Sequence, residues 1–247
     1  TSDRFIIRHF HEFSDIGIYG TSAKLASVIN FMILNAFFMG YTSIAFRKHT
    51  DPVFLKLQPT IIRFVSWLVM AAIWFLSLFS ETILEILSKD DDYLLAHLYI
   101  PYFGVIMGFV GLQNFLAMAF HFSHQTKKNI PIVLVALVVN IVLALILVPI
   151  HPIYGALGSS IGSMFVMLVM TYRNAVNVFE DFVGLGNLTR IVLVILAGAA
   201  LCISAIHLEV LKPFWVRAAL FLGMTLLALF VLRIKPKMVI TTLRSWF

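Results

Sequence analysis

Charged side chains are scarce in this chain of 247 residues, since Asp, Glu, Lys and Arg make up only 12% of it. Soluble domains carry about 25% charged residues, and about half of their residues are apolar. Here 61% of the residues are hydrophobic and the mean hydropathy is +0.97. A core of this size cannot hide so much apolar surface from water. The composition therefore excludes a soluble enzyme, a nucleic-acid-binding domain and a disordered chain.

Cysteine is nearly absent, and an initiating Met is absent altogether. Cys202 is the single cysteine, so an intramolecular disulfide is excluded, and it lies in an apolar run. The chain opens at Thr1 and Ser2, with no cleavable signal peptide before its first apolar run. From this opening we expect a fragment of a longer protein.

Metal ligands in complete sets are lacking too. His9 with His11, and His121 with His124, have no further ligands nearby in the sequence. The acidic run 90–92 lacks the spacing of a calcium loop, and no triad of Ser, His and an acid can be assembled. We therefore expect no metal, no cofactor and no enzymatic activity.

What the chain does contain is a series of seven long apolar runs, at about 16–46, 61–80, 96–122, 130–150, 153–172, 188–206 and 214–232. Most are long enough to cross a hydrocarbon core of about 30 Å as α-helices, and they are too long for strands. The predicted fold class is all-α, a polytopic transmembrane bundle of about seven spans. An amphipathic piece at 83–87 is expected to lie at the membrane interface.

Basic residues are distributed unevenly between the connecting segments. The segments after the first, third, fifth and seventh runs contain twelve of the 18 Lys and Arg, whereas the opposite segments contain five and most of the acids. Cytoplasmic loops are enriched in Lys and Arg. The start of the chain is therefore predicted to lie outside, and the C-terminus in the cytoplasm.

Lys24 is the clearest ionisable residue inside an apolar run. At about 100° per residue, Lys24, Asn35 and Thr42 fall on one face of the first run, with Gly20 and Ser27 beside them. Because charges inside a span are usually functional, we interpret this stripe as a wall of an aqueous cavity whose cation faces an anionic substrate. The alternative is a lysine that snorkels to the outer interface, since Lys24 lies only about eight residues into the run.

Other polar residues inside the runs have two interpretations. Gln113 and Asn114 in the third run, and Asn140 in the fourth, either line the same cavity or hydrogen-bond between helices, and for Asn140 the hydrogen bond is favoured. Gly158 and Gly162 have the small-xxx-small spacing that indicates close helix packing. No strand precedes them and no lysine follows, which excludes a phosphate-binding loop.

Three stretches follow a pattern known from transporters. They are Asp3-Arg4 with Ile16-Gly17-Ile18-Tyr19-Gly20 and Lys24, then Leu78-Phe79-Ser80-Glu81 through Ile100-Pro101, and Ala136-Leu137-Val138-Val139-Asn140 with Val148-Pro149 and Tyr154-Gly155-Ala156-Leu157-Gly158. In these stretches the chain resembles the C-terminal half of bacterial polysaccharide flippases, the polysaccharide-transporter branch of the superfamily containing MATE exporters and lipid II flippases. It departs from them at Arg8, His9 and His11, where a shorter and less basic loop is usual.

The resemblance implies two six-helix lobes around a central cationic cavity, with two additional C-terminal helices. Residues 1–172 would form the C-terminal lobe, from the end of helix seven through helix twelve. Residues 173–247 would form the two additional helices and a cytoplasmic tail. The missing N-terminal half of the same protein would be a partner.

Transporters similar to this one move undecaprenyl-pyrophosphate-linked oligosaccharides across the bacterial cytoplasmic membrane by alternating access. The resemblance implies that Arg4 and Lys24 contact phosphate or acidic sugars and that Asp3 orients Arg4. The candidate substrate-binding residues are Asp3, Arg4, Lys24, Asn35, Gln113 and Asn114. The expected partners are this lipid-linked oligosaccharide and membrane lipids, and not nucleic acid.

Three other functions remain open at this point. A cation-coupled exporter on the same scaffold requires a cation-binding acid within a span, which the apolar runs lack. A membrane glycan polymerase or ligase requires a sizeable external loop with catalytic residues, and no such loop is present. In a purely structural scaffold, the polar stripe around Lys24 would be an unnecessary cost.

Overall fold

The structure is a computed structural model that describes residues 7–8, 13–48, 50–87, 91–176, 184–208 and 213–234. All secondary structure in these residues is helical, and seven helical segments are long and apolar enough to cross a membrane, which confirms the predicted all-α bundle. The elements are α2 (Phe13–Ile29), η1 (Asn30–Asn35), α3 (Ala36–Lys48), α4 (Pro52–Leu87), η2 (Asp91–Tyr99), α5 (Ile100–Phe122), η3 (Thr126–Lys128), α6 (Asn129–Leu147), α7 (Pro152–Val176), α8 (Leu185–His207) and α9 (Phe214–Val231).

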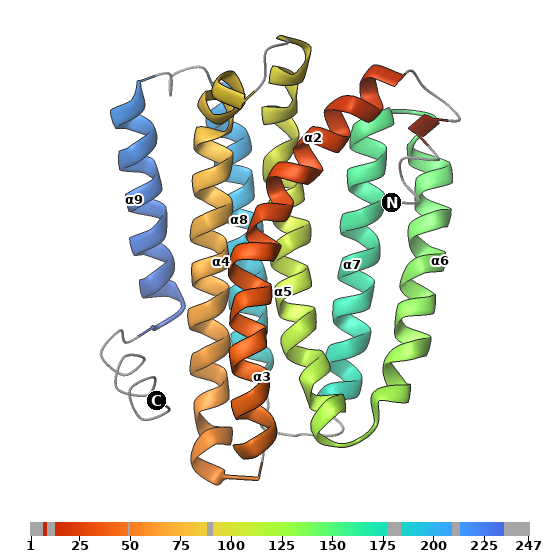
Figure 1. Cartoon of the computed structure of the whole chain (residues 1–247), viewed down its shortest axis with the longest axis vertical. Coiled ribbons are helices and arrows are strands. Elements are labelled where there is room, and N and C mark those ends of the chain that lie inside the picture. Colours follow the sequence, from red (N-terminus) through yellow and green to blue (C-terminus); the bar gives the residue numbers. More distant parts are fainter. Residues whose placement is uncertain are drawn as a thin grey trace.

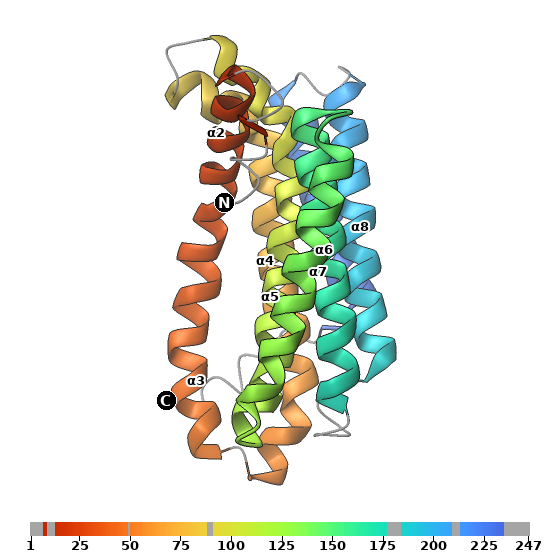
Figure 2. The ribbon, with the colours of Figure 1, turned by 90° about the vertical axis from the view of Figure 1, so that its right-hand side faces the viewer.

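Spans that follow one another in the chain run in opposite directions, with α9 at one edge of the bundle beside α4 and α6 at the other edge beside α7 (Figure 1). The segment from η2 through α5 is the most buried of the seven, because α4, α7 and α8 all pack against α5. The segment of α2, η1 and α3 lies across one face of the other helices, as Figure 2 shows from the side. Among the described residues, protein therefore covers the first span on one side only.

The first span is not the continuous α-helix that its sequence predicts. Residues Asn30–Asn35 form a π-helical turn between α2 and α3. A π-helix has i to i+5 hydrogen bonds and therefore more residues per turn than an α-helix. The 100° spacing that places Lys24, Asn35 and Thr42 on one face consequently does not hold across this turn. Lys24 and Asn35 are both exposed, and Thr42 is half-buried.

Helix α4 is longer than the run at 61–80 from which it was predicted. It begins at Pro52, in the first turn where proline is tolerated, and passes through Pro59. This first part of the helix was not predicted, because polar residues interrupt its apolar pattern. One of them is Gln58, which is buried and accepts a hydrogen bond from the Tyr41 hydroxyl. The amphipathic piece predicted at 83–87 forms the last turns of α4, where Leu84 is buried against η2 and α2 while Ile86 and Leu87 are exposed.

Helices α6 and α7 form a tight hairpin that depends on glycine. A Cβ at Gly155 would lie 2.4 Å from the backbone oxygen of Leu147, so no larger residue fits there. A Cβ at Gly162 would lie 2.9 Å from Leu143 Cδ1, and one at Gly158 would lie 3.5 Å from Leu147 Cδ1. These distances confirm that the small-residue spacing packs helices together.

Three side chains of α4 and α9 bond these two helices together along their length. Arg217 Nη2 donates to Glu81 Oε2 at 2.6 Å, Trp67 Nε1 to the Thr225 carbonyl at 3.0 Å, and Arg63 Nη1 to the Leu232 carbonyl at 3.4 Å. Apolar residues of α8 and α9 also belong to the core that α4 and α5 form. Helix α9 is thus tied to α4 at both ends and in the middle.

Candidate functional site

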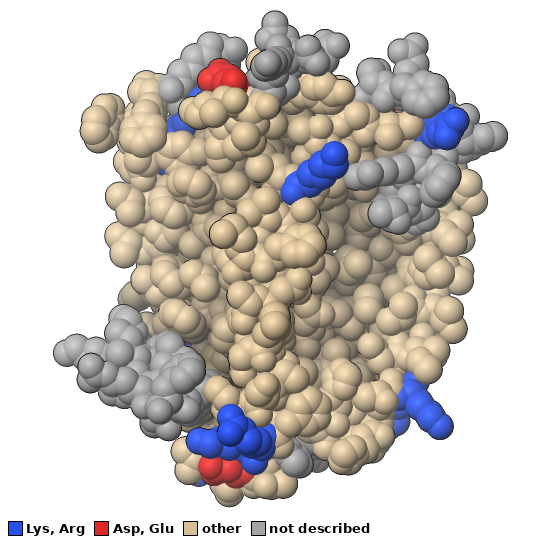
Figure 3. Space-filling view, viewed as in Figure 1, with Lys and Arg blue, Asp and Glu red and all other residues tan. Residues whose placement is uncertain are grey.

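The two ends of the bundle differ in charge. At the end where α3 stops and α5 turns into α6, the described basic residues are Arg47, Lys48, Lys56, Arg63, Lys127, Lys128, Arg173, Arg190 and Arg233, and Asp51 is the described acid. The other end carries Asp15, Glu81, Glu85, Asp91 and Asp92 with Arg8, Lys24 and Arg217. Figure 3 shows Lys and Arg at both ends of one face, with the larger group at the lower end. The basic end is the one that the positive-inside rule assigns to the cytoplasm.

Lys24 lies beside the last turn of α4, at the acidic end of the bundle. Its exposed side chain lines a depression of about 380 Å³ with Thr21 and Val28 of α2, Leu84 and Leu87 of α4, and Tyr93. No described acid forms an ion pair with Lys24. Its ammonium is therefore available to an anion at this end. The same position suits both the mouth of a cavity and a lysine that snorkels to the interface.

A larger cleft lies on the other side of α2. It measures about 450 Å³ and is enclosed by α2, α5, α6 and α7. Tyr19 and Ala23 form its α2 wall, and Asn140 and Ser163 supply polar groups on the opposite wall. Asn140 Nδ2 lies 3.5 Å from Ser163 Oγ, a long interhelical hydrogen bond of the kind predicted for this residue. Helix α2 thus separates the Lys24 depression from a mainly apolar cleft.

Gln113 is the most unusual polar residue of the bundle interior. Its side chain is 6% exposed, and neither its Oε1 nor its Nε2 has a hydrogen-bond partner among the described residues. The predicted alternative of an interhelical hydrogen bond is therefore not formed by Gln113. Its neighbour Asn114 is half-buried. A buried amide without partners costs about 1–3 kcal/mol, so its presence calls for an explanation.

The predicted site residues that the structure describes do not converge on one cavity. Lys24 lines the depression beside α4, Asn35 is exposed at the end of the π-helical turn, and Gln113 is buried in α5. Asp3 and Arg4 lie outside the described residues. What the described side chains offer is an exposed cation and an exposed amide on the first span, and a separate buried amide in α5.

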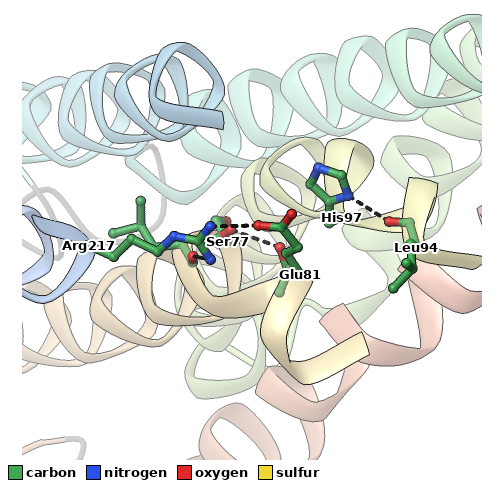
Figure 4. A network of polar contacts seen from close by, with 7 residues as sticks. Ser77, Glu81, Leu94, His97 and Arg217 are labelled. Carbon is green, nitrogen blue, oxygen red and sulfur yellow. Dashed lines mark hydrogen bonds and ion pairs between the residues drawn. The ribbon is translucent and has the colours of Figure 1, made fainter. Parts of the chain in front are cut away.

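A polar pocket that the sequence did not indicate lies between α4, η2, α8 and α9. It measures about 350 Å³, and its lining includes His207. Ser77, Glu81, His97 and Arg217 line it as well (Figure 4). His97 Nδ1 lies 2.6 Å from the Leu94 carbonyl, a contact that holds its ring in place. The paired residues Glu81 and Arg217 are 136 positions apart in the sequence, and no sequence motif contains both.

A metal site is not formed in the described part of the chain, where no three His, Cys, Asp or Glu side chains come together. Comparisons with models of protein families, with curated proteins and with solved structures give no match. The class of protein is therefore defined by the fold alone. The chain is an all-α, multi-pass helix bundle with seven segments able to span a membrane.

Proposed function

We propose that this chain forms one lobe of a flippase that moves a lipid-linked oligosaccharide across the bacterial cytoplasmic membrane by alternating access. The observation that carries the proposal is the exposed Lys24 on a membrane-spanning helix, in a depression where no described acid neutralises it. Such a charge is costly in lipid and is usually retained for function.

The chemistry of the substrate explains why such residues are needed. A pyrophosphate with sugars attached cannot enter hydrocarbon unless polar groups replace its hydration. Lys24 supplies a cation, and Asn35 supplies an exposed amide on the same span. The unpartnered amide of Gln113 is a further group whose cost is offset if it serves the pathway during part of the transport cycle.

A second lobe completes this proposal. The first span exposes the apolar side chains of Phe31, Met32 and Met39 on the same stretch as Lys24 and Asn35. Lipid suits the apolar side chains, whereas an aqueous cavity suits Lys24 and Asn35. One wall cannot enclose a substrate, and alternating access requires a second body that moves against the first. The N-terminal half of a larger protein is the proposed partner.

A cation-coupled exporter is the second candidate, because α4 extends through Glu81 and places an acid inside a long apolar helix. A cation site, however, requires a carboxylate free to bind the cation. Glu81 is committed to Arg217 at 2.6 Å. We therefore favour the flippase, and we propose no enzymatic role.

The experiment is an export assay with Lys24 variants of the full natural protein that contains residues 1–247, expressed in a flippase-deficient bacterial strain. Lys24→Ala is expected to abolish surface glycan while membrane abundance stays unchanged, and Lys24→Arg to retain export because it keeps the charge. Lys56→Ala is the matched control, since Lys56 is an exposed lysine near the start of α4 and outside the depression. Normal export by Lys24→Ala would reject the site and leave the snorkelling lysine as the explanation.

A further inference from the structure

An apolar groove runs between α8 and α9 on the outside of the bundle. Its volume is about 270 Å³. Trp74 of α4 and Gly198 of α8 are buried in it, and a Cβ at position 198 would lie 2.2 Å from the indole Nε1 of Trp74. Leu193 and Leu227 line it as well and are 64% and 60% exposed. The groove therefore opens toward the surroundings of the bundle.

Arginine side chains gather at one end of this groove. Arg190, near the start of α8, lines it together with Val231, the last residue of α9. Arg63 of α4 donates a hydrogen bond of 3.4 Å to the carbonyl of Leu232, directly after that helix. Both Arg190 and Arg233 lie within electrostatic range of Arg63. Arg190 thus lines the end of the groove at which Arg63 bonds to Leu232, the residue that precedes Arg233 in the chain.

These arginines have no negative partner in the part of the chain that the structure describes. Arg190 and Arg233 are exposed and Arg63 is half-buried. Like charges held close together repel one another, and an anion bound between them relieves that repulsion. Guanidinium groups match the oxygens of a phosphate in charge and in geometry.

The length of the groove suits one leaflet of a membrane. Its lining extends along α8 from Arg190 to Leu201, which is about 16 Å at 1.5 Å per residue. Half of a hydrocarbon core of about 30 Å is about 15 Å. A fatty acyl chain that begins beside the arginines would follow the groove to about the middle of the membrane.

Other occupants account for only half of these observations. Free phosphate would bind the arginines and leave the apolar groove empty. An apolar helix of a second copy would fill the groove and leave the arginines without an anion. A lipid with a phosphate headgroup accounts for both, and basic pockets between transmembrane helices are known to bind anionic headgroups.

We propose that the groove between α8 and α9 is a binding site for an anionic phospholipid, with its phosphate at Arg63, Arg190 and Arg233 and one acyl chain along the groove. The site does not depend on the proposed transport function, because none of the residues that line it belongs to α2 or α3.

The test is native mass spectrometry of the chain in detergent, with phosphatidylglycerol or phosphatidylcholine of identical acyl chains. Phosphatidylglycerol is expected to bind more tightly. Arg190→Gln and Arg233→Gln should each weaken its binding about fivefold. Arg173→Gln is the matched control, since Arg173 is an exposed arginine at the same end of the bundle but outside the groove. This variant should bind phosphatidylglycerol as tightly as the wild type does.

A second pair of variants tests the acyl chain. Ala197→Trp places a large side chain in the groove and should weaken phosphatidylglycerol binding, whereas Ala200→Trp changes an exposed alanine of the same helix outside the groove and should not. Equal binding of the two lipids, or equal effects of the two tryptophans, would overturn the proposal. So would inorganic phosphate that binds as tightly as the phospholipid, because the groove would then contribute nothing.

Discussion

Arg217 of α9 and Glu81 of α4 form an ion pair in which Nη2 lies 2.6 Å from Oε2, at the acidic end of the bundle (Figure 4). The Arg217 side chain is 14% exposed and that of Glu81 is 42% exposed. Arg217 also donates to the Leu78 carbonyl at 3.4 Å. The guanidinium is therefore held between a charged and a neutral acceptor, in a position that fixes the start of α9 on α4.

Removing the carboxylate should loosen α9, because the largely buried guanidinium then loses its ion pair with Glu81. We expect Glu81→Ala to lower the free energy of unfolding by about 1–2 kcal/mol, a value reduced by the partial exposure of Glu81. The measurement is thermal unfolding of the chain in detergent. Glu85→Ala, one turn further along and exposed, is the control and should leave stability unchanged. Equal stability of both variants would show that the pair contributes nothing.

Gly198 provides a second test of how the C-terminal helices pack. Alanine there would place Cβ 2.2 Å from Trp74 Nε1, which forces the indole or α8 to move, and we expect a loss of about 1–3 kcal/mol in unfolding free energy. At Gly223, in the interior of α9, nothing lies within 4 Å, so Gly223→Ala should be neutral or stabilise by about 0.4–1 kcal/mol. The two alanine variants are compared by unfolding in detergent. A stable Gly198→Ala would contradict this packing.

The spans were predictable because each is a long apolar run, and length alone distinguishes such helices from strands. The seven predicted runs all correspond to helices. What the runs could not predict is helix structure where polar residues occur. Gln58 and Glu81 interrupt the apolar pattern of α4, yet the helix continues through both. Tyr41 donates to Gln58 Oε1, whose Nε2 has no partner among the described residues, and Arg217 donates to Glu81 Oε2. Both partners come from other helices and are visible only after folding.

The candidate site was predictable only in part. Lys24 stands out in sequence because a charge in an apolar run is rare. Its relation to Asn35 was not predictable, since a π-helical turn changes the angular spacing and no residue pattern announces it. The cluster of Arg63, Arg190 and Arg233 was missed as well, because its members come from three separate segments and were counted only as loop charges.

Gln113 allows stability and function to be separated. Gln113→Leu removes a buried amide without partners, so we expect the unfolding free energy of the chain to rise by about 1 kcal/mol. If the amide serves the transport pathway, the same variant of the full natural protein should export less glycan. Gln58→Leu is the opposite case: it deprives the Tyr41 hydroxyl of its acceptor and should destabilise the chain. A stabilised Gln113→Leu protein with normal export would remove Gln113 from the site.

The orientation predicted from the basic residues can be tested by cysteine labelling. In a Cys202→Ser background, Asp91→Cys should react with a membrane-impermeant reagent in intact cells, whereas Lys127→Cys should react only after the membrane is opened. The expectation follows from the gathering of Lys and Arg at the end of the bundle that contains η3. Labelling of position 127 and not of position 91 in intact cells would reverse the assignment.

The most direct test of the proposed function is translocation in purified liposomes. The full natural protein containing residues 1–247 would be reconstituted with a fluorescent undecaprenyl-pyrophosphate-linked oligosaccharide in one leaflet, and its appearance in the other leaflet measured by protection from a glycosidase. We predict translocation by the wild type and by Lys24→Arg, and none above protein-free liposomes for Lys24→Ala. Translocation that is absent in the wild type, or unchanged by Lys24→Ala, would contradict the proposal that Lys24 lines the path of a lipid-linked glycan.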